Sequence, residues 1–165
     1  MRLLVISDTH GIHTHVRDVI KRVQPDLMYH LGDAQGMEDE LIALAGCPCE
    51  CVRGNCDWGS SLPAYVVTTL GSHRVFITHG HMYDVKFSMW TLVNAAKEKD
   101  CDVAMYGHTH YPALLEKDGV TILNPGSISL PRQPGREPSF AVCDVDNEGE
   151  LHFNINYLKE EDYAF

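Results

Sequence analysis

The fold is decided near the N-terminus, by the stretch Leu3-Leu4-Val5-Ile6-Ser7-Asp8-Thr9-His10-Gly11. Four consecutive apolar residues followed by a turn signal predict a strand that is buried on both faces. Asp8 and His10 follow this strand, and residues two apart in extended backbone point to the same side. Ligands of open α/β sheets bind in the crevice beyond the carboxyl ends of the strands. A carboxylate and an imidazole at this place predict a divalent-metal site, whereas a helix cap and a loop histidine are the simpler alternative for this stretch alone.

The composition is that of one globular domain, which we expect to span residues 1–165. Of the 165 residues, 44% are hydrophobic and 22% are charged, as in an ordinary globular protein. The formal net charge of −10 argues against stable nucleic-acid binding, because phosphate contacts require basic patches. An anionic substrate is still compatible, since bound divalent cations invert the local field. Without a membrane-length apolar run or a signal peptide, we expect a cytoplasmic protein with no membrane contact.

The cysteines do not follow the spacing of a zinc site. They are Cys47, Cys49, Cys51, Cys56, Cys101 and Cys143. Paired Cys-x-x-Cys motifs are typical of structural zinc, and the spacing here is Cys-x-Cys-x-Cys. We therefore expect reduced cysteines that act as small hydrophobic residues, with a zinc-structural or redox protein as a minor alternative.

The first third of the chain predicts alternating strands and helices. Apolar residues at helical spacing predict one helix that starts at the N-cap Thr14 and stops before Pro25, and a second helix over 37–45 that ends at Gly46. Strands are expected at 27–31 and 48–53. This order is typical of a mainly parallel sheet with crossover helices.

The rest of the chain is richer in strands, which we expect at 64–70, 74–78, 102–106, 113–116, 120–123, 140–145 and 151–157. One further helix is expected over 89–96. Asp118-Gly119 predicts a hairpin, and Asn124-Pro125-Gly126-Ser127 predicts a turn. Apolar and polar residues alternate over 151–157, so this strand should have one solvated face. A charged tail follows from Lys159 to Asp162.

Ligand-type side chains follow five of the predicted strands. They are Asp8, His10, Asp33, Asn55, His79, His108 and His110. Gly32, Gly54 and Gly107 precede three of these residues, and glycine lets the backbone turn sharply and approach a ligand closely. Mixed carboxylate, amide and imidazole ligands suit Mn, Fe, Ni, Co or Zn better than Ca or Mg. Because these ligands are too many for one ion, the pattern predicts two ions that share a bridging carboxylate.

In this order, the motifs Asp-x-His, Gly-Asp, Gly-Asn, His-Gly and Gly-His-x-His resemble those of the calcineurin-like metallophosphoesterase family. The resemblance runs from Ser7 to about Val145, and the Gly-Asn-Cys-Asp variant is similar to the small YfcE-type phosphodiesterases of bacteria and archaea. It implies an α/β fold, a four-layer α/β/β/α sandwich of two mixed sheets. It also implies a dinuclear metal-dependent phosphoesterase, above all a phosphodiesterase, in which a hydroxide held between the ions attacks phosphorus.

The resemblance assigns a role to each ligand-type residue. Asp8, His10 and His110 would hold the first metal, and Asn55, His79 and His108 would complete the second. Asp33 would bridge both ions. Mn is the expected metal, with Ni, Fe, Co or Zn as alternatives, and the expected substrate is a small or nucleotide-derived phosphate ester.

One position departs from the family's pattern. Phosphoprotein phosphatases of this fold carry a histidine after Gly-Asn that serves or supports the acid for the leaving group, and here that residue is Cys56. A neutral thiol is a poor general acid near neutral pH, which weighs against esters with poor leaving groups. Beside Asn55, the candidate catalytic residues are therefore Asp57, which could orient a donor, and His81. Cys56 itself is interpreted as a small side chain that packs under the metals.

A non-enzymatic scaffold is the alternative function. The retromer subunit of the same fold resembles this chain in its Gly-His-Thr-His and Asn-Pro-Gly-Ser segments, yet works chiefly in protein assembly. The presence of Asp8, His10, Asp33 and Asn55 together favours the enzyme.

Several exposed-type residues allow two interpretations. Arg53 could orient a phosphate or form a structural salt bridge, and Arg132 and Arg136 could approach an anionic substrate or remain in a solvated loop. Aromatic residues could line a pocket or a contact between copies of the chain in a homo-oligomer. These are Trp58, Tyr83, Phe87 and Trp90.

Overall fold

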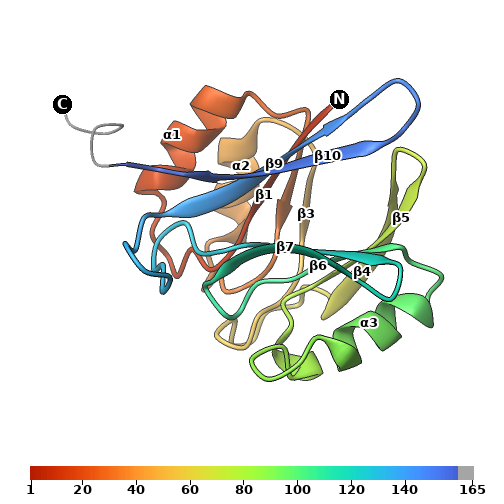
Figure 1. The fold of residues 1–165 in the computed structure, drawn as a ribbon. Coiled ribbons are helices and arrows are strands. Elements are labelled where there is room, and N and C mark those ends of the chain that lie inside the picture. The colour runs from red at the N-terminus through yellow and green to blue at the C-terminus, as the bar shows by residue number, and fades with distance from the viewer. Residues whose placement is uncertain (160–165) are drawn as a thin grey trace.

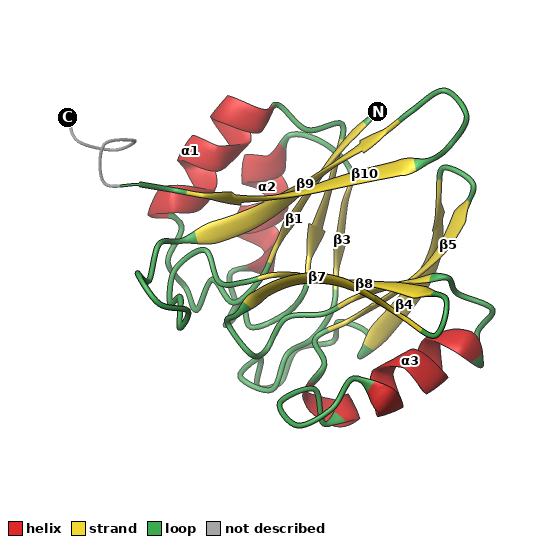
Figure 2. Cartoon of the chain, viewed as in Figure 1, coloured by secondary structure: helices red, strands yellow, loops and turns green. Residues whose placement is uncertain are grey.

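A computed structural model describes residues 1–159, so most of the predicted charged tail lies outside the described residues. Within them, the strands form two five-stranded sheets that lie face to face, with helices on both outer sides (Figures 1 and 2). This is the α/β/β/α arrangement that the sequence predicts.

Both sheets are mixed. Sheet A has the order β10 (Leu151–Tyr157), β9 (Ser139–Val145), β1 (Arg2–Ile6), β2 (Leu27–His30) and β3 (Cys49–Cys51). Sheet B has the order β4 (Tyr65–Leu70), β5 (His73–Thr78), β6 (Val103–Met105), β8 (Val120–Pro125) and β7 (Pro112–Lys117). The strands β1, β2 and β3 are parallel, as are β5, β6 and β8. The carboxyl ends of each parallel set therefore lie at one edge of its sheet.

The helices cover the outer faces. The helices α1 (Thr14–Val23) and α2 (Glu38–Ala45) cover sheet A, and α3 (Trp90–Lys97) covers sheet B (Figure 2). The prediction that Thr14 caps α1 is wrong. His13 occupies the N-cap without a side-chain cap hydrogen bond, and Thr14 is the first helical residue. The prediction for the end of α2 is confirmed, because Gly46 adopts φ 62° as its C-cap.

The alternation of β1 explains why its apolar run is continuous. Leu3 and Val5 belong to the core between the two sheets, which also contains Ile77 and Met105 of sheet B. Leu4 and Ile6 point to the opposite face and pack beneath α1 and α2. A third cluster, which includes Phe76, Leu92 and Ala104, fills the space under α3. A strand with helices on one face and a sheet on the other has no solvated side.

Two local predictions require correction. The predicted turn at 124–127 begins later, because β8 extends through Asn124 and Pro125, which pair with β7. The neighbour β6 pairs with β8 only as far as Leu123, so no ladder bond on that side needs an N–H at Pro125. The predicted alternation of β10 fails at its end, where Tyr157 is exposed because it is the last residue of an edge strand. No helix within residues 1–159 is long and apolar enough to cross a membrane.

Candidate metal centre

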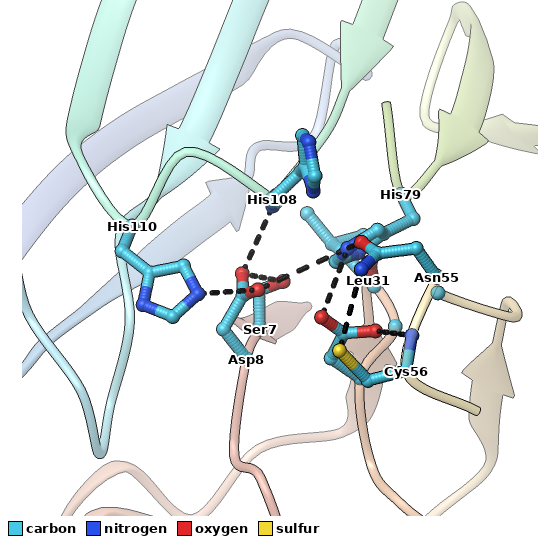
Figure 3. A network of polar contacts seen from close by, with 12 residues as sticks. Ser7, Asp8, Leu31, Asn55, Cys56, His79, His108 and His110 are labelled. Carbon is cyan, nitrogen blue, oxygen red and sulfur yellow. Dashed lines mark hydrogen bonds and ion pairs between the residues drawn. The ribbon is translucent and has the colours of Figure 1, made fainter. Parts of the chain in front are cut away.

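The predicted ligand residues come together in the loops that follow five strands. Asp8 and His10 follow β1, Asp33 follows β2, Asn55 follows β3, His79 follows β5, and His108 and His110 follow β6. Loops from both sheets thus meet at one place, and Figure 3 labels Asp8 together with Asn55, His79, His108 and His110.

The backbone argument for Asp8 and His10 requires correction. The strand β1 ends at Ile6, and neither residue is extended: Asp8 has φ 55° and His10 has φ 47°. Their side chains nevertheless converge, with His10 Nε2 3.8 Å from Asp8 Oδ1. Left-handed backbone is shared by five of the predicted ligands, which are Asp8, His10, Asp33, His108 and His110. Such conformations are uncommon outside glycine and cluster at functional sites, where the surrounding structure holds them.

Asp8 is fully buried and has one oxygen without a hydrogen bond. Its Oδ2 accepts hydrogen bonds from Ser7 Oγ at 2.6 Å and from the backbone N–H of His108 at 3.0 Å. Among the described residues, Oδ1 makes no hydrogen bond, although His110 Nε2 lies 3.1 Å away and His79 Nε2 lies 3.9 Å away. Burial opposes ionisation, but the facing imidazoles outweigh it and lower the pKa of Asp8. A buried anionic oxygen that faces ring nitrogens in this way suits a bound cation.

Asp33 is the second buried carboxylate. Its Oδ1 accepts the backbone N–H of Cys56 at 2.8 Å. Its Oδ2 lies 3.3 Å from His79 Nε2 and 3.7 Å from His10 Nε2. Burial acts to raise the pKa of Asp33, but its contacts with His79 and Cys56 lower it well below its usual range. Asp33 therefore presents a charged oxygen to the same space as Asp8.

Backbone carbonyls orient two of the histidines. His79 Nδ1 donates to the carbonyl of Leu31 at 2.6 Å, and His110 Nδ1 donates to the carbonyl of Leu130 at 2.6 Å. Each ring therefore turns Nε2 towards the carboxylates. Metal-binding histidines use this arrangement, because the outer hydrogen bond sets the tautomer and the ring orientation.

Ring nitrogens and one amide oxygen face one another across the centre. His10 Nε2 lies 3.3 Å from His110 Nε2, and His79 Nε2 lies 3.1 Å from Asn55 Oδ1. A cation between such groups would be coordinated by their lone pairs, so the donor set fits divalent metals with mixed nitrogen and oxygen ligands.

Three overlapping groups of side chains could each hold an ion. They are Asp8 with His10 and His110, Asp8 with Asp33 and His79, and His10 with Asp33 and Cys56. Both carboxylates are shared between groups, as a site for two ions requires. The ring of His108 is outside these groups and lies edge-on to the ring of His79, with the two ring centroids 5.2 Å apart.

The two candidate catalytic residues Asp57 and His81 lie in different surroundings. Asp57 is buried, and its carboxylate accepts backbone N–H groups from Asp33, Gln35 and Gly54 at 2.6–2.8 Å. It therefore joins two ligand loops and does not face the centre as a free acid. The ring of His81 lies 5.5 Å from that of His79, and burial lowers its pKa.

Sequence reasoning missed most of the groups that support the ligands. Cys56 was interpreted only as packing, yet its thiol belongs to one of the potential metal-binding groups and accepts a hydrogen bond from Asn55 Nδ2 at 3.3 Å. The hydroxyl of Ser127 donates to the carbonyl of Asp8 at 2.8 Å, which gives the loop after β8 a structural role. The contact between Ser127 and Asp8 joins residues far apart in the chain, so local patterns carry no signal for it.

Two glycines allow the loops to approach the carboxylates. A Cβ at Gly54 would collide with Asp33 Oδ1, and a Cβ at Gly107 would collide with Ser7 Oγ. The close approach that the sequence predicts for these glycines is therefore present.

Comparisons with known proteins agree with this geometry. A family model described as the calcineurin-like phosphoesterase superfamily domain matches residues 1–148. The probable metallophosphoesterase YsnB of Bacillus subtilis (strain 168) is 35% identical over 150 residues, which cover 90% of this chain and 86% of YsnB. The phosphodiesterase YfcE of Escherichia coli (strain K12) is 33% identical over 103 residues, which cover 58% of this chain and 52% of YfcE. A Streptococcus pneumoniae TIGR4 crystal structure, described as a predicted phosphoesterase, has a TM-score of 0.81 and 32% identity, covering 94% of this chain and 88% of that chain.

Proposed function

The chain belongs to the calcineurin-like phosphoesterase superfamily, and from this premise we propose that it is a metal-dependent phosphodiesterase acting on a small or nucleotide-derived phosphate ester. The observation that carries the proposal is the environment of Asp8 Oδ1. This buried oxygen has no hydrogen bond among the described residues, and histidine nitrogens of both sheets surround it. Such an atom is costly to bury unless a cation pairs with it.

The family implies divalent metal ions, and the ligand assignment is part of the proposal. Asp8, His10 and His110 would hold one ion, Asn55, His79 and His108 would hold the other, and Asp33 would contribute to both. Mn is the metal we expect, with Ni, Fe, Co or Zn able to bind the same donors. When bound, the ions supply positive charge for the phosphoryl oxygens and lower the pKa of water.

Other residues of the chain hold these metal-binding side chains in place. The carbonyls of Leu31 and Leu130 keep Nε2 of His79 and His110 facing inwards. Asp57 fixes the backbone of Asp33 and Gly54, so its role is positioning. Asn55 extends from the exposed side of the centre, where it is placed to contact a phosphate oxygen.

A leaving group would receive little help from a protonated side chain. His81 is the nearest candidate donor, but burial lowers its pKa, so it is mostly neutral near neutral pH. A neutral imidazole is a weaker acid than an imidazolium. Diesters whose alcohols leave readily are therefore the expected substrates.

The proposal includes a single domain over residues 1–165 and a cytoplasmic location. A homo-oligomer is also part of it, since Trp58 and Phe87 are 92% and 90% exposed. The alternative of a non-catalytic scaffold is less well supported, because each predicted ligand position is filled by a side chain able to bind a metal.

The test is hydrolysis of bis(p-nitrophenyl) phosphate and p-nitrophenyl phosphate by protein stripped of metal and reloaded with Mn²⁺. We expect diester hydrolysis to exceed monoester hydrolysis and to be lost in Asp33→Ala. The matched control is Asp39→Ala, because Asp39 is an exposed carboxylate on α2. Bound metal without turnover, with each of Mn²⁺, Ni²⁺, Fe²⁺ and Zn²⁺, would contradict the enzyme and favour the scaffold.

A further inference from the structure

A pocket of about 510 Å³ lies beside the metal centre. It is lined by Val85, Lys86, Tyr106, Thr109, Tyr111, Ala113 and Arg132. These residues come from four segments: the loop after η1 (His81–Tyr83), the β6–β7 connection, β7 itself, and the loop between β8 and β9. The volume is within the usual range for small-molecule sites.

Two residues that line the pocket adjoin candidate ligands. Thr109 stands between His108 and His110 in the chain, and Asn124 Nδ2 holds its hydroxyl at 2.9 Å. The backbone N–H of Arg132 donates to the carbonyl of His110 at 3.2 Å. A molecule in this pocket would therefore lie beside the loop that carries His108 and His110.

The pocket has an apolar body. Val85 and Tyr106 are buried members of the cluster under α3, and they form a rigid inner wall. Ala113 adds a small side chain on β7, and Tyr111 is 49% exposed at the rim. Aromatic walls of this kind accept a planar ring, which stacks or meets them edge to face.

Two positively charged side chains, Lys86 and Arg132, line the pocket, although the formal net charge of the chain is −10. Lys86 and Arg132 are exposed, and within residues 1–159 neither side chain forms a hydrogen bond or an ion pair. Arginine binds phosphate through its planar fork, and lysine binds it as a point charge. Arg136 lies in the same loop as Arg132 but does not line the pocket.

We propose that this pocket binds the alcohol portion of a phosphodiester, and that this portion is a nucleotide: a planar base with a second phosphate, held by Lys86 and Arg132. The inference rests on the proposed function and specifies its substrate class. Hydrolysis breaks the P–O bond to this alcohol. The alcohol oxygen takes a proton from water, phosphorus takes the hydroxide, and the pocket then releases a nucleotide with a free hydroxyl group.

Two dinucleotides that differ only in the second phosphate test its contribution to binding. In pApA the leaving alcohol is AMP, whereas in ApA it is adenosine. We expect kcat/KM for pApA to exceed that for ApA by about tenfold, from two charge-assisted contacts. Lys86→Ala with Arg132→Ala should remove this preference through a higher KM for pApA. Arg136→Ala is the matched control and should keep the preference.

A binding measurement tests the pocket without turnover. Calorimetric titration of the metal-free protein with AMP and with adenosine should show about tenfold tighter binding of AMP, lost in the double variant. Metal-free protein is required because bound ions would compete for the phosphate. Failure to hydrolyse bis(p-nitrophenyl) phosphate with any metal would contradict the proposed function alone. Equal treatment of pApA and ApA, AMP binding no tighter than adenosine binding, or preferences that persist in the double variant would overturn the pocket assignment.

Discussion

Asp57 Oδ2 accepts the backbone N–H of Asp33 at 2.8 Å, and the same oxygen accepts the N–H of Gly54 at 2.7 Å. One buried carboxylate therefore fixes the loops after β2 and β3 relative to each other. Asp33 Oδ1 in turn accepts the N–H of Cys56. The two aspartates form a reciprocal pair in which each holds the backbone of the other's loop.

Replacing Asp57 should weaken metal binding without removing a candidate ligand. In Asp57→Asn, an amide N–H would face backbone N–H donors, and a buried donor left unsatisfied costs about 1–3 kcal/mol. We expect that loss in the free energy of urea unfolding, together with reduced retention of Mn²⁺ on dialysis. Asp39→Asn, on exposed α2, is the control and should change neither quantity. Full metal retention in Asp57→Asn would show that Asp57 does not position the ligands.

Metal content should distinguish the two halves of the centre. His110 and His79 belong to different ligand groups that share Asp8. His110→Ala and His79→Ala should therefore each retain about one ion per chain, where the parent holds about two. Elemental mass spectrometry of the purified proteins measures this. Loss of both ions in each single variant would mean that the groups bind only as a unit.

Gly54→Ala should disrupt the centre by steric overlap. The added methyl would collide with Asp33, and overpacking of this kind costs about 1–3 kcal/mol. We expect lower stability in urea unfolding and loss of metal. Gly36→Ala is the comparison, because nothing lies within 4 Å of a Cβ there although its φ is +79°. That variant should keep its metal, and equal metal loss in both would rule out the collision as the cause.

Burial of His30 should make stability depend on pH. Burial lowers its pKa from 6.5 to about 4, and its nitrogens contact Thr9 Oγ1 and the N–H of Gly32. Between these values the unfolded chain binds more protons, so stability rises with pH. The metal-free protein should be about 3 kcal/mol less stable below pH 4 than above pH 6.5 from this group alone. Unfolding of His30→Asn across this range should show a smaller slope, and an unchanged slope would assign the effect to other groups.

The sequence predicts the layers and the ligand loops because both depend on local patterns. The apolar run of β1 and the helical spacing of apolar residues in α1 each predict which faces of the element are buried. Parallel strands bring their carboxyl ends to one edge of the sheet. The positive φ at Asp8 and His10 was not predicted, because aspartate and histidine adopt left-handed backbone in only a small fraction of cases. The predicted turn at 124–127 was placed too early, because pairing with β7 extends β8 through Pro125. This pairing is a contact between strands that the local sequence does not show.

The contacts that orient the candidate ligands could not be predicted from the sequence. Leu130 orients His110 through its backbone carbonyl, and any residue type offers a carbonyl. The role of Asp57 depends on which backbone N–H groups lie near it, and this follows from the packing of two loops. The pocket at Lys86 and Arg132 joins segments more than forty positions apart, as the residue numbers show.

The division of the candidate ligands between the two sheets has a consequence for how the protein matures. Sheet A supplies Asp8, His10, Asp33 and Asn55, all within the first third of the chain, whereas every histidine from sheet B comes later, the last being His110. A growing chain on the ribosome therefore cannot assemble the centre until the second sheet has been made and has docked. On this ligand assignment, the complete metal centre would form only after the two sheets have joined.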